Sequence, residues 1–161
     1  MVFEVRAAVP DDARRIAELH VLTWQETYAH LLPPGFLDEA HSRMRREMWD
    51  RILRDGRPEL TVRVAVSEGK IVGFAMSGPS QGGDAPRDRQ LYNIYVLQAA
   101  HGTGIGQALL AGVLGAEPAM LWVAKENPRA IAFYRRNGFE LDGATEFEAA
   151  TPAITHVRMV R

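Results

Sequence analysis

LYNIYVLQAAHGTGIGQALL, residues 91–110, is the stretch that decides the fold of this chain. It reads as an apolar strand, a turn with glycine at the alternate positions 102, 104 and 106, and the start of an amphipathic helix. Glycine tolerates the positive φ that such a turn needs, and without Cβ the turn can direct its backbone N–H groups inward. Inward N–H groups at the positive end of a helix bind anions. The stretch therefore predicts a site for a phosphate-bearing cofactor.

The spacing of these glycines excludes two other phosphate-binding motifs. A dinucleotide fingerprint, G-x-G-x-x-G, would require glycine where the chain has Gln107 or Leu109. A nucleotide phosphate loop would require Lys and then Ser or Thr after the last glycine, where the chain has Gln107 and Ala108. On this stretch alone, a glycine-rich turn that binds no ligand remains an alternative.

The glycine-rich turn resembles the pyrophosphate loop of the GNAT superfamily of N-acetyltransferases. The signature of that loop, Q/R-x-x-G-x-G/A, falls on His101, Gly104 and Gly106. Histidine thus stands where the family has glutamine or arginine. We expect a weaker side-chain contact to phosphate and an intact backbone cradle.

A second motif, ENPRAIAFYRRNGF at residues 126–139, points to the same family. Asn127 suits a helix N-cap, Pro128 suits the first turn and Gly138 suits a left-handed stop, so a helix is predicted over 128–137. Asn127 and Tyr134 then share one helix face, about 10 Å apart along the axis. The segment resembles the GNAT motif N-P-x-A-x-x-F-Y-x-x-x-G-F. In that family the Asn bonds the pantetheine arm and the Tyr lies beside the thioester sulfur. An ordinary half-buried aromatic is the alternative for Tyr134, and the order of the two motifs favours the family role.

The remaining pattern follows the order of elements in the same family. Helices are expected from Pro10 onward and over 38–53, 105–115 and 128–137, and strands over 2–7, 60–67, 70–77, 90–97, 119–124, 139–149 and 153–160. The resemblance implies an α/β protein with the GNAT fold, a mixed, mostly antiparallel sheet of about seven strands flanked by about four helices. Residues 1–161 are expected to form a single N-acetyltransferase domain.

The resemblance also implies acetyl-CoA as acetyl donor, without a metal. Tyr134 would act as general acid, and the backbone N–H of Ile94 would stabilise the oxyanion. The pantetheine arm would lie along the strand at Ile94 and Val96 like an added strand. The full set of expected cofactor contacts is Ile94, Tyr95, Val96, His101, Gly102, Thr103, Gly104, Ile105, Gly106, Gln107, Asn127 and Tyr134.

The acceptor side is predicted between the first two helices, at residues 23–38. Trp24 and Tyr28 lie one helical turn apart in a W-x-x-x-Y segment like that of many small bacterial GNAT enzymes, and with His30 they are candidates for binding the substrate. Packing of these aromatics onto the sheet is the alternative. In a continuous helix Glu26 would point away from the face that Trp24 and Tyr28 share, so it is expected to reach the pocket only if the helix breaks or begins near Trp24.

The general base is not assigned by the sequence. Some GNAT enzymes have Glu four residues before the position of Ile94, where this chain has Gln90, which cannot act as a base. A water chain would serve, and each candidate carboxylate or imidazole can equally be a surface group. The candidates are Glu26, His30, Asp84 and Glu146, of which Glu26 is preferred.

Composition excludes several classes of function. A net charge of −1 argues against a broad nucleic-acid surface, and the longest apolar region, 105–124, is broken by polar residues and a proline, so no membrane partner is expected. The chain has no cysteine, so it has no disulfide or thiolate site, and its five histidines lack metal-ligand spacing. The early charges do not fit a signal peptide, and a cytoplasmic location is expected. Of the basic residues 17 are Arg and 2 are Lys, so phosphate contacts would come from arginine.

Three functions remain. The leading prediction is an acetyl-CoA-dependent N-acetyltransferase that acts on the primary amine of a small molecule. The first alternative is acetylation of a protein N-terminus or a lysine, which would need an open groove. The second is an acyl-CoA-binding sensor on the same fold, for which Tyr134 beside Asn127 would be unnecessary. The oligomeric state stays open, a homodimer included.

Overall fold

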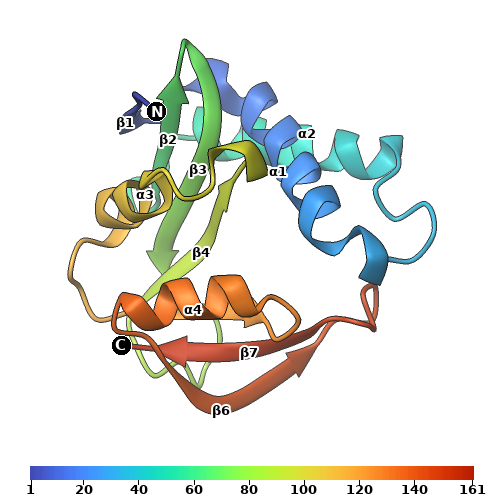
Figure 1. The fold of residues 1–161 in the computed structure, drawn as a ribbon, viewed down its shortest axis with the longest axis vertical. Coiled ribbons are helices and arrows are strands. Elements are labelled where there is room, and N and C mark those ends of the chain that lie inside the picture. Colours follow the sequence, from blue (N-terminus) through green and yellow to red (C-terminus); the bar gives the residue numbers. More distant parts are fainter.

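The computed structural model describes residues 1–161 and shows a twisted sheet with helices on both faces (Figure 1). The strands are β1 (Glu4–Ala7), β2 (Thr61–Ser67), β3 (Lys70–Pro79), β4 (Arg89–Val96), β5 (Met120–Ala124), β6 (Glu140–Phe147) and β7 (Thr155–Val160). The α-helices are α1 (Ala13–Tyr28), α2 (Glu39–Arg54), α3 (Ile105–Leu114) and α4 (Pro128–Arg136). No helix is both long enough and apolar enough to span a membrane.

The seven strands form one sheet in the order β1-β2-β3-β4-β5-β7-β6. All neighbours are antiparallel except β4 and β5, which are parallel because α3 connects them as a crossover. This topology confirms the mixed, mostly antiparallel sheet. The pairing of β4 with β5 is confined to Gln90 opposite Met120 and Leu91 opposite Leu121. Beyond Leu91 the two strands separate, and the sheet opens at its centre (Figure 1).

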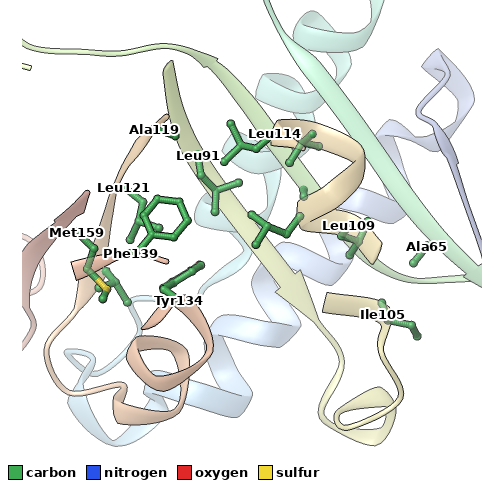
Figure 2. Packing of buried hydrophobic residues seen from close by; sticks show 14 of the residues in the cluster. Ala65, Leu91, Ile105, Leu109, Leu114, Ala119, Leu121, Tyr134, Phe139 and Met159 are labelled. Carbon is green, nitrogen blue, oxygen red and sulfur yellow. The ribbon is translucent and has the colours of Figure 1, made fainter. Parts of the chain in front are cut away.

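The two larger of three apolar clusters pack against the sheet, one on each face. On one face α1 and α2 cover β2 and β3, with Trp49 and Phe74 fully buried between them. On the other face α3 and α4 cover the centre of the sheet, and Figure 2 shows Leu109 of α3 and Tyr134 of α4 in this cluster together with Phe139. Burial of such large side chains stabilises the fold by about 1.5–3 kcal/mol each. The two clusters thus cover the sheet from both faces.

A buried histidine joins α1 to α2. His20 is 5% exposed, and its Nδ1 accepts a hydrogen bond from Trp49 Nε1 at 3.1 Å. Burial, with the positive charges of Arg45 and His41 adding to it, lowers the pKa of His20 from 6.5 to about 3. The folded protein therefore holds His20 neutral over the acid range in which the unfolded chain takes up a proton.

Stability should consequently fall as the pH is lowered below about 6.5. Between pH 6.5 and about 3 the unfolded chain protonates His20 and the folded protein does not. The stability that the neutral His20 contributes is therefore complete above pH 6.5 and is lost progressively as the pH falls toward 3. Urea unfolding should show a loss of up to about 3 kcal/mol between pH 7 and pH 4. His20→Asn keeps an acceptor for Trp49 and should flatten this profile, whereas His30→Asn, at an exposed histidine, should leave it unchanged. Equal slopes in the wild type and His20→Asn would contradict the assignment.

Candidate active site

A cavity of about 590 Å³ lies where β4 and β5 separate, and is called the main cavity below. One end is formed by the glycine-rich turn before α3, the middle by β4 and α4, and the other end by the last turns of α1 and by residues 154–156. Nearly every site residue expected from the sequence lies along it: Trp24, Glu26, Tyr28, Ile94, Tyr95, Val96, His101, Gly102, Gly104, Gly106, Gln107, Asn127 and Tyr134.

The glycine-rich turn presents a row of unpaired backbone donors to the main cavity. Gly102 and Gly104 have φ of +75° and +88°, and a Cβ added at either would meet no atom within 4 Å. The backbone N–H groups of residues 102–107 make no hydrogen bond within the protein, since the first bond of α3 runs from Ala108 N to Gly104 O at 3.0 Å. Open space before unpaired N–H groups at a helix N-terminus fits an anionic phosphate.

Two of the predicted contacts in the turn hold its shape instead of lining the main cavity. Thr103 Oγ1 donates to Ala100 O at 2.6 Å, and the side chain of Ile105 is 1% exposed in the core. Only the backbone N–H groups of these two residues belong to the unpaired row. Their side chains therefore position the cradle from behind.

The backbone of β4 offers hydrogen-bonding groups to the gap between the strands. β4 pairs with β3 so that Tyr95 lies opposite Phe74, and just beyond, Leu97 N donates to Val72 O at 3.0 Å. The peptide groups of Tyr95 and Leu97 therefore face β3. Since peptide groups of successive residues in an antiparallel strand face opposite edges, those of Ile94 and Val96 point away from β3 and into the gap. His101 Nε2 lies 2.9 Å from Val96 O, so the groups left for a ligand are the N–H and C=O of Ile94 and the N–H of Val96.

Tyr134 projects from α4 into the space between that helix and the sheet, beside Phe139 (Figure 2). It is 7% exposed, lines the main cavity, and its hydroxyl forms no hydrogen bond to another protein group. Burial, with the phenols of Tyr95 and Tyr28 nearby, raises the pKa of Tyr134 well above its ordinary value. The hydroxyl therefore keeps its proton at neutral pH and is available to a ligand.

Asn127 caps α4 and ties it to α1. Its Oδ1 accepts from Ala130 N at 3.1 Å, as expected of an N-cap, and its Nδ2 donates to Tyr28 Oη at 3.2 Å. Burial raises the pKa of Tyr28 to about 12, so this phenol is also neutral. One N–H of the Asn127 amide remains for a ligand, because the other is used by Tyr28.

Aromatic side chains line the α1 end of the main cavity. Trp24 Nε1 donates to Tyr95 Oη at 3.0 Å. The centroid of the Trp24 ring lies 5.2 Å from that of Tyr28 and 6.3 Å from that of Phe36. Trp24 and Tyr28 thus both pack within the protein and line the cavity. His30 lies in the exposed turn Ala29–Leu31 and does not line it.

Glu26 reaches the main cavity in a way that differs from the expected one. α1 continues without a break through Glu26 to Tyr28, and Glu26 still lines the main cavity. The expectation that Glu26 would reach the pocket only if the helix broke or began near Trp24 was therefore wrong. The reason is tertiary: the turn that follows β4 lies against the end of α1, and Gln98 N donates to Glu26 Oε2 at 3.0 Å. Glu26 is the one carboxylate in the lining.

The other candidate bases lie elsewhere. Asp84 is exposed and 3.8 Å from Arg158, and Glu146 is exposed on β6; neither lines the main cavity. Gln90 is 7% exposed, and its Oε1 accepts from Gln81 N at 3.0 Å, which anchors the loop before β4. This residue has a structural role that glutamine fills without ionising.

Sequence reasoning missed three basic groups of the lining, His156 on β7 and both Arg129 and Arg136 on α4. Nothing local marks His156, because only the pairing of β7 with β5 places it opposite Ala124 at the cavity. Arg129 follows the N-cap of the second motif, and its place in the first turn of α4 was a usable signal.

Known proteins with similar sequences and structures point to one family. Residues 15–139 match the model of the acetyltransferase (GNAT) family. An uncharacterised N-acetyltransferase of Bacillus subtilis is 33% identical, over 91% of this chain and 85% of its own length. A probable N-acetyltransferase of Mycobacterium tuberculosis is 32% identical, over 88% and 82%.

Among solved structures, the PaiA N-acetyltransferase of Thermoplasma acidophilum, crystallised with coenzyme A, superposes with a TM-score of 0.72 at 18% identity, covering 98% of both chains. That likeness confirms the fold expected from the two motifs. With the family match over most of its length and the sequence relatives above, the chain belongs to the GNAT family of acetyltransferases.

Proposed function

We propose that this protein transfers the acetyl group of acetyl-CoA to the primary amine of a small molecule. The observation that carries the proposal is the row of unpaired N–H groups at residues 102–107, placed at one end of the cavity that Tyr134 lines. Acetyl-CoA would supply an activated thioester and the phosphates that fit this row. Support also comes from a protein of the same fold that was crystallised with coenzyme A.

The chain's own groups have distinct tasks in this proposal. Gly102, Gly104 and the first N–H groups of α3 hold the pyrophosphate. The peptide groups of Ile94 and Val96 that face the gap pair with the pantetheine arm as an added strand would, and the Ile94 N–H faces the developing oxyanion. Asn127 offers its remaining amide N–H to the arm.

Tyr134 supplies a proton at its hydroxyl. A thiol has an ordinary pKa near 8.5 and a tyrosine near 10. Burial raises the pKa of Tyr134 further, so a free phenolate is unfavourable in this site. The hydroxyl therefore donates its proton to the leaving sulfur through a hydrogen bond, and the phenolate must regain a proton at once. The amine that attacks the thioester loses a proton in the same turnover and is the natural source.

The aromatic side chains at the α1 end support a small acceptor. Trp24 is held by Tyr95 and packed on Phe36, so its ring is a fixed part of the wall that a compact amine would contact. Glu26 is the carboxylate nearest to this end that can attract a cationic amine.

Replacing Glu26 with glutamine should raise the acceptor KM about fivefold, the effect of losing an exposed ion pair worth ~1 kcal/mol. The amide oxygen can still accept from Gln98 N, so the fold and the acetyl-CoA KM should not change. The control is Glu18→Gln, which removes a carboxylate of the same helix that pairs with Arg14. Unchanged acceptor kinetics across the pH range in Glu26→Gln would remove this residue from the acceptor site.

The proposed function is tested by incubating the protein with acetyl-CoA and a panel of primary amines, polyamines and peptides, and by measuring the thiol released. We expect release with one or more small amines and none with peptides. Release only with peptides would overturn the proposed acceptor class. Binding of acetyl-CoA in calorimetry without release for any acceptor would favour the sensor instead.

A further inference from the structure

We propose that Arg129, held in place by His101, is a side-chain cation that binds a phosphate of CoA in this protein. This inference rests on the proposed function and assigns a task to the histidine that departs from the family signature. His101 would act as a positioning residue, and Arg129 would contact the ligand.

The hydrogen bonds of His101 define its protonation. Its Nε2 lies 2.9 Å from the carbonyl oxygen of Val96, which can only accept, so Nε2 must carry a hydrogen. Its Nδ1 faces Nη1 of Arg129, which can only donate, so Nδ1 must present its lone pair. The neutral imidazole protonated on Nε2 is the form that satisfies both contacts. His101 therefore links the end of β4 to α4 across 28 residues of sequence.

This arrangement engages both ring nitrogens of His101 within the protein, although the residue lines the main cavity. The side chain is tied back to β4 through Val96 O and forward to Arg129. In the GNAT signature the same position carries glutamine or arginine, either of which can extend toward a phosphate. The lost contact is replaced by a guanidinium that reaches the glycine-rich turn from α4.

Arg129 has the position and the free charge for this task. It lies in the first turn of α4, whose start is fixed by the Asn127 cap, and lines the main cavity together with Gly102 and Gly104. It is exposed, and the ion pairs of the chain, from Arg6–Asp12 to Arg158–Asp142, do not include it. A guanidinium without a carboxylate partner binds phosphate oxygens in a planar, bidentate manner.

Calorimetric titration with CoA tests the contact itself. Arg129→Ala should weaken CoA binding roughly 10- to 100-fold, as expected for a charged hydrogen-bonding group. The matched control is Arg135→Ala, which removes the same charge from the same helix at an exposed position outside the main cavity, and should change the Kd by less than about twofold. Equal losses in the two variants would overturn the proposal, because a general field effect would explain them.

The role of His101 is tested by rescue and by coupling. His101→Ala should weaken CoA binding, whereas His101→Gln, which keeps one donor and one acceptor, should retain most of the affinity. In an Arg129→Ala background His101→Gln should bind no better than His101→Ala, because a gain there would come from a direct contact of glutamine with phosphate. The double variant His101→Ala/Arg129→Ala should bind no more weakly than Arg129→Ala alone, because His101 acts through Arg129. Additive losses would overturn the positioning role, and melting temperatures would confirm that each variant is folded.

A comparison of CoA with 3′-dephospho-CoA identifies which phosphate is bound. If the effect of Arg129→Ala disappears with the dephospho ligand, the contact is to the ribose 3′-phosphate; if it persists, the contact is to the pyrophosphate. Wild-type affinity in both Arg129→Ala and His101→Ala would overturn this inference while leaving the proposed function intact. Absence of CoA binding by the wild type would instead refute the proposed function.

Discussion

Replacing Tyr134 with phenylalanine should lower kcat by about 10²–10⁴, the usual effect of removing a general acid. The centroid of the Tyr134 ring lies 5.9 Å from that of Phe139, and the hydroxyl forms no hydrogen bond to the protein, so the substitution removes only the group that is proposed to face the ligand. The Kd for CoA should change little, and so should the melting temperature. Steady-state kinetics at a fixed acceptor concentration, with calorimetry for CoA, would measure both.

Tyr92→Phe is the matched control for this experiment. Tyr92 also lines the main cavity, but its hydroxyl already donates to the carbonyl of Pro79 at the end of β3, so it is not free for a ligand. Its removal should leave kcat within a small factor of the wild-type value. A Tyr134→Phe variant that turns over as fast as Tyr92→Phe would refute the acid role.

The direction of the pKa shift adds a further check. Because burial raises the pKa of Tyr134 above its ordinary value, this phenol stays protonated throughout the range in which the protein can be assayed. An alkaline loss of kcat below about pH 10 must therefore come from another group.

Replacing Gly104 with valine should weaken CoA binding roughly 100-fold or more. The new side chain would project into the open space before the unpaired N–H groups, where the phosphate is proposed to lie, and charge-assisted hydrogen bonds worth about 1.5–3 kcal/mol each would be lost. The φ of +88° also strains any residue with a Cβ, so the free energy of unfolding should fall by about 1–3 kcal/mol.

Gly115→Val separates these two effects. Gly115 lies at the C-terminal end of α3, as Gly104 lies at its N-terminal end. Its φ is +57°, and a Cβ added there would also meet no atom within 4 Å. Its replacement should cost at least as much stability, since its ψ of −132° lies outside the left-handed region, and should leave CoA affinity unchanged, because it does not line the main cavity. If calorimetry shows that a folded Gly104→Val protein binds CoA as tightly as Gly115→Val does, the glycine-rich turn does not bind the phosphate.

The features that could be read from the sequence are those encoded by neighbouring residues. The turn at 102–106 requires positive φ at Gly102 and Gly104, and both have it in the structure. The ends of α4 were predictable because a cap bonds only its own first turn, as Asn127 does with Ala130. The alternating valines of β2 all face the cluster under α1 and α2, since side chains alternate along a strand.

The sequence by itself thus determined the fold family, through the resemblance of two short motifs, and the glycine-rich end of the cavity, because that turn depends on backbone conformations that a few adjacent residues impose. The tertiary structure decided the rest. The contact of Asn127 with Tyr28 joins residues 99 positions apart, and the contact of Glu26 with Gln98 joins residues 72 apart. Such contacts depend on where β4 and β5 separate and on how α1 and α4 pack across the gap. Local periodicity says which face of an element is apolar, but the partner that meets that face is chosen by the packing of the whole chain.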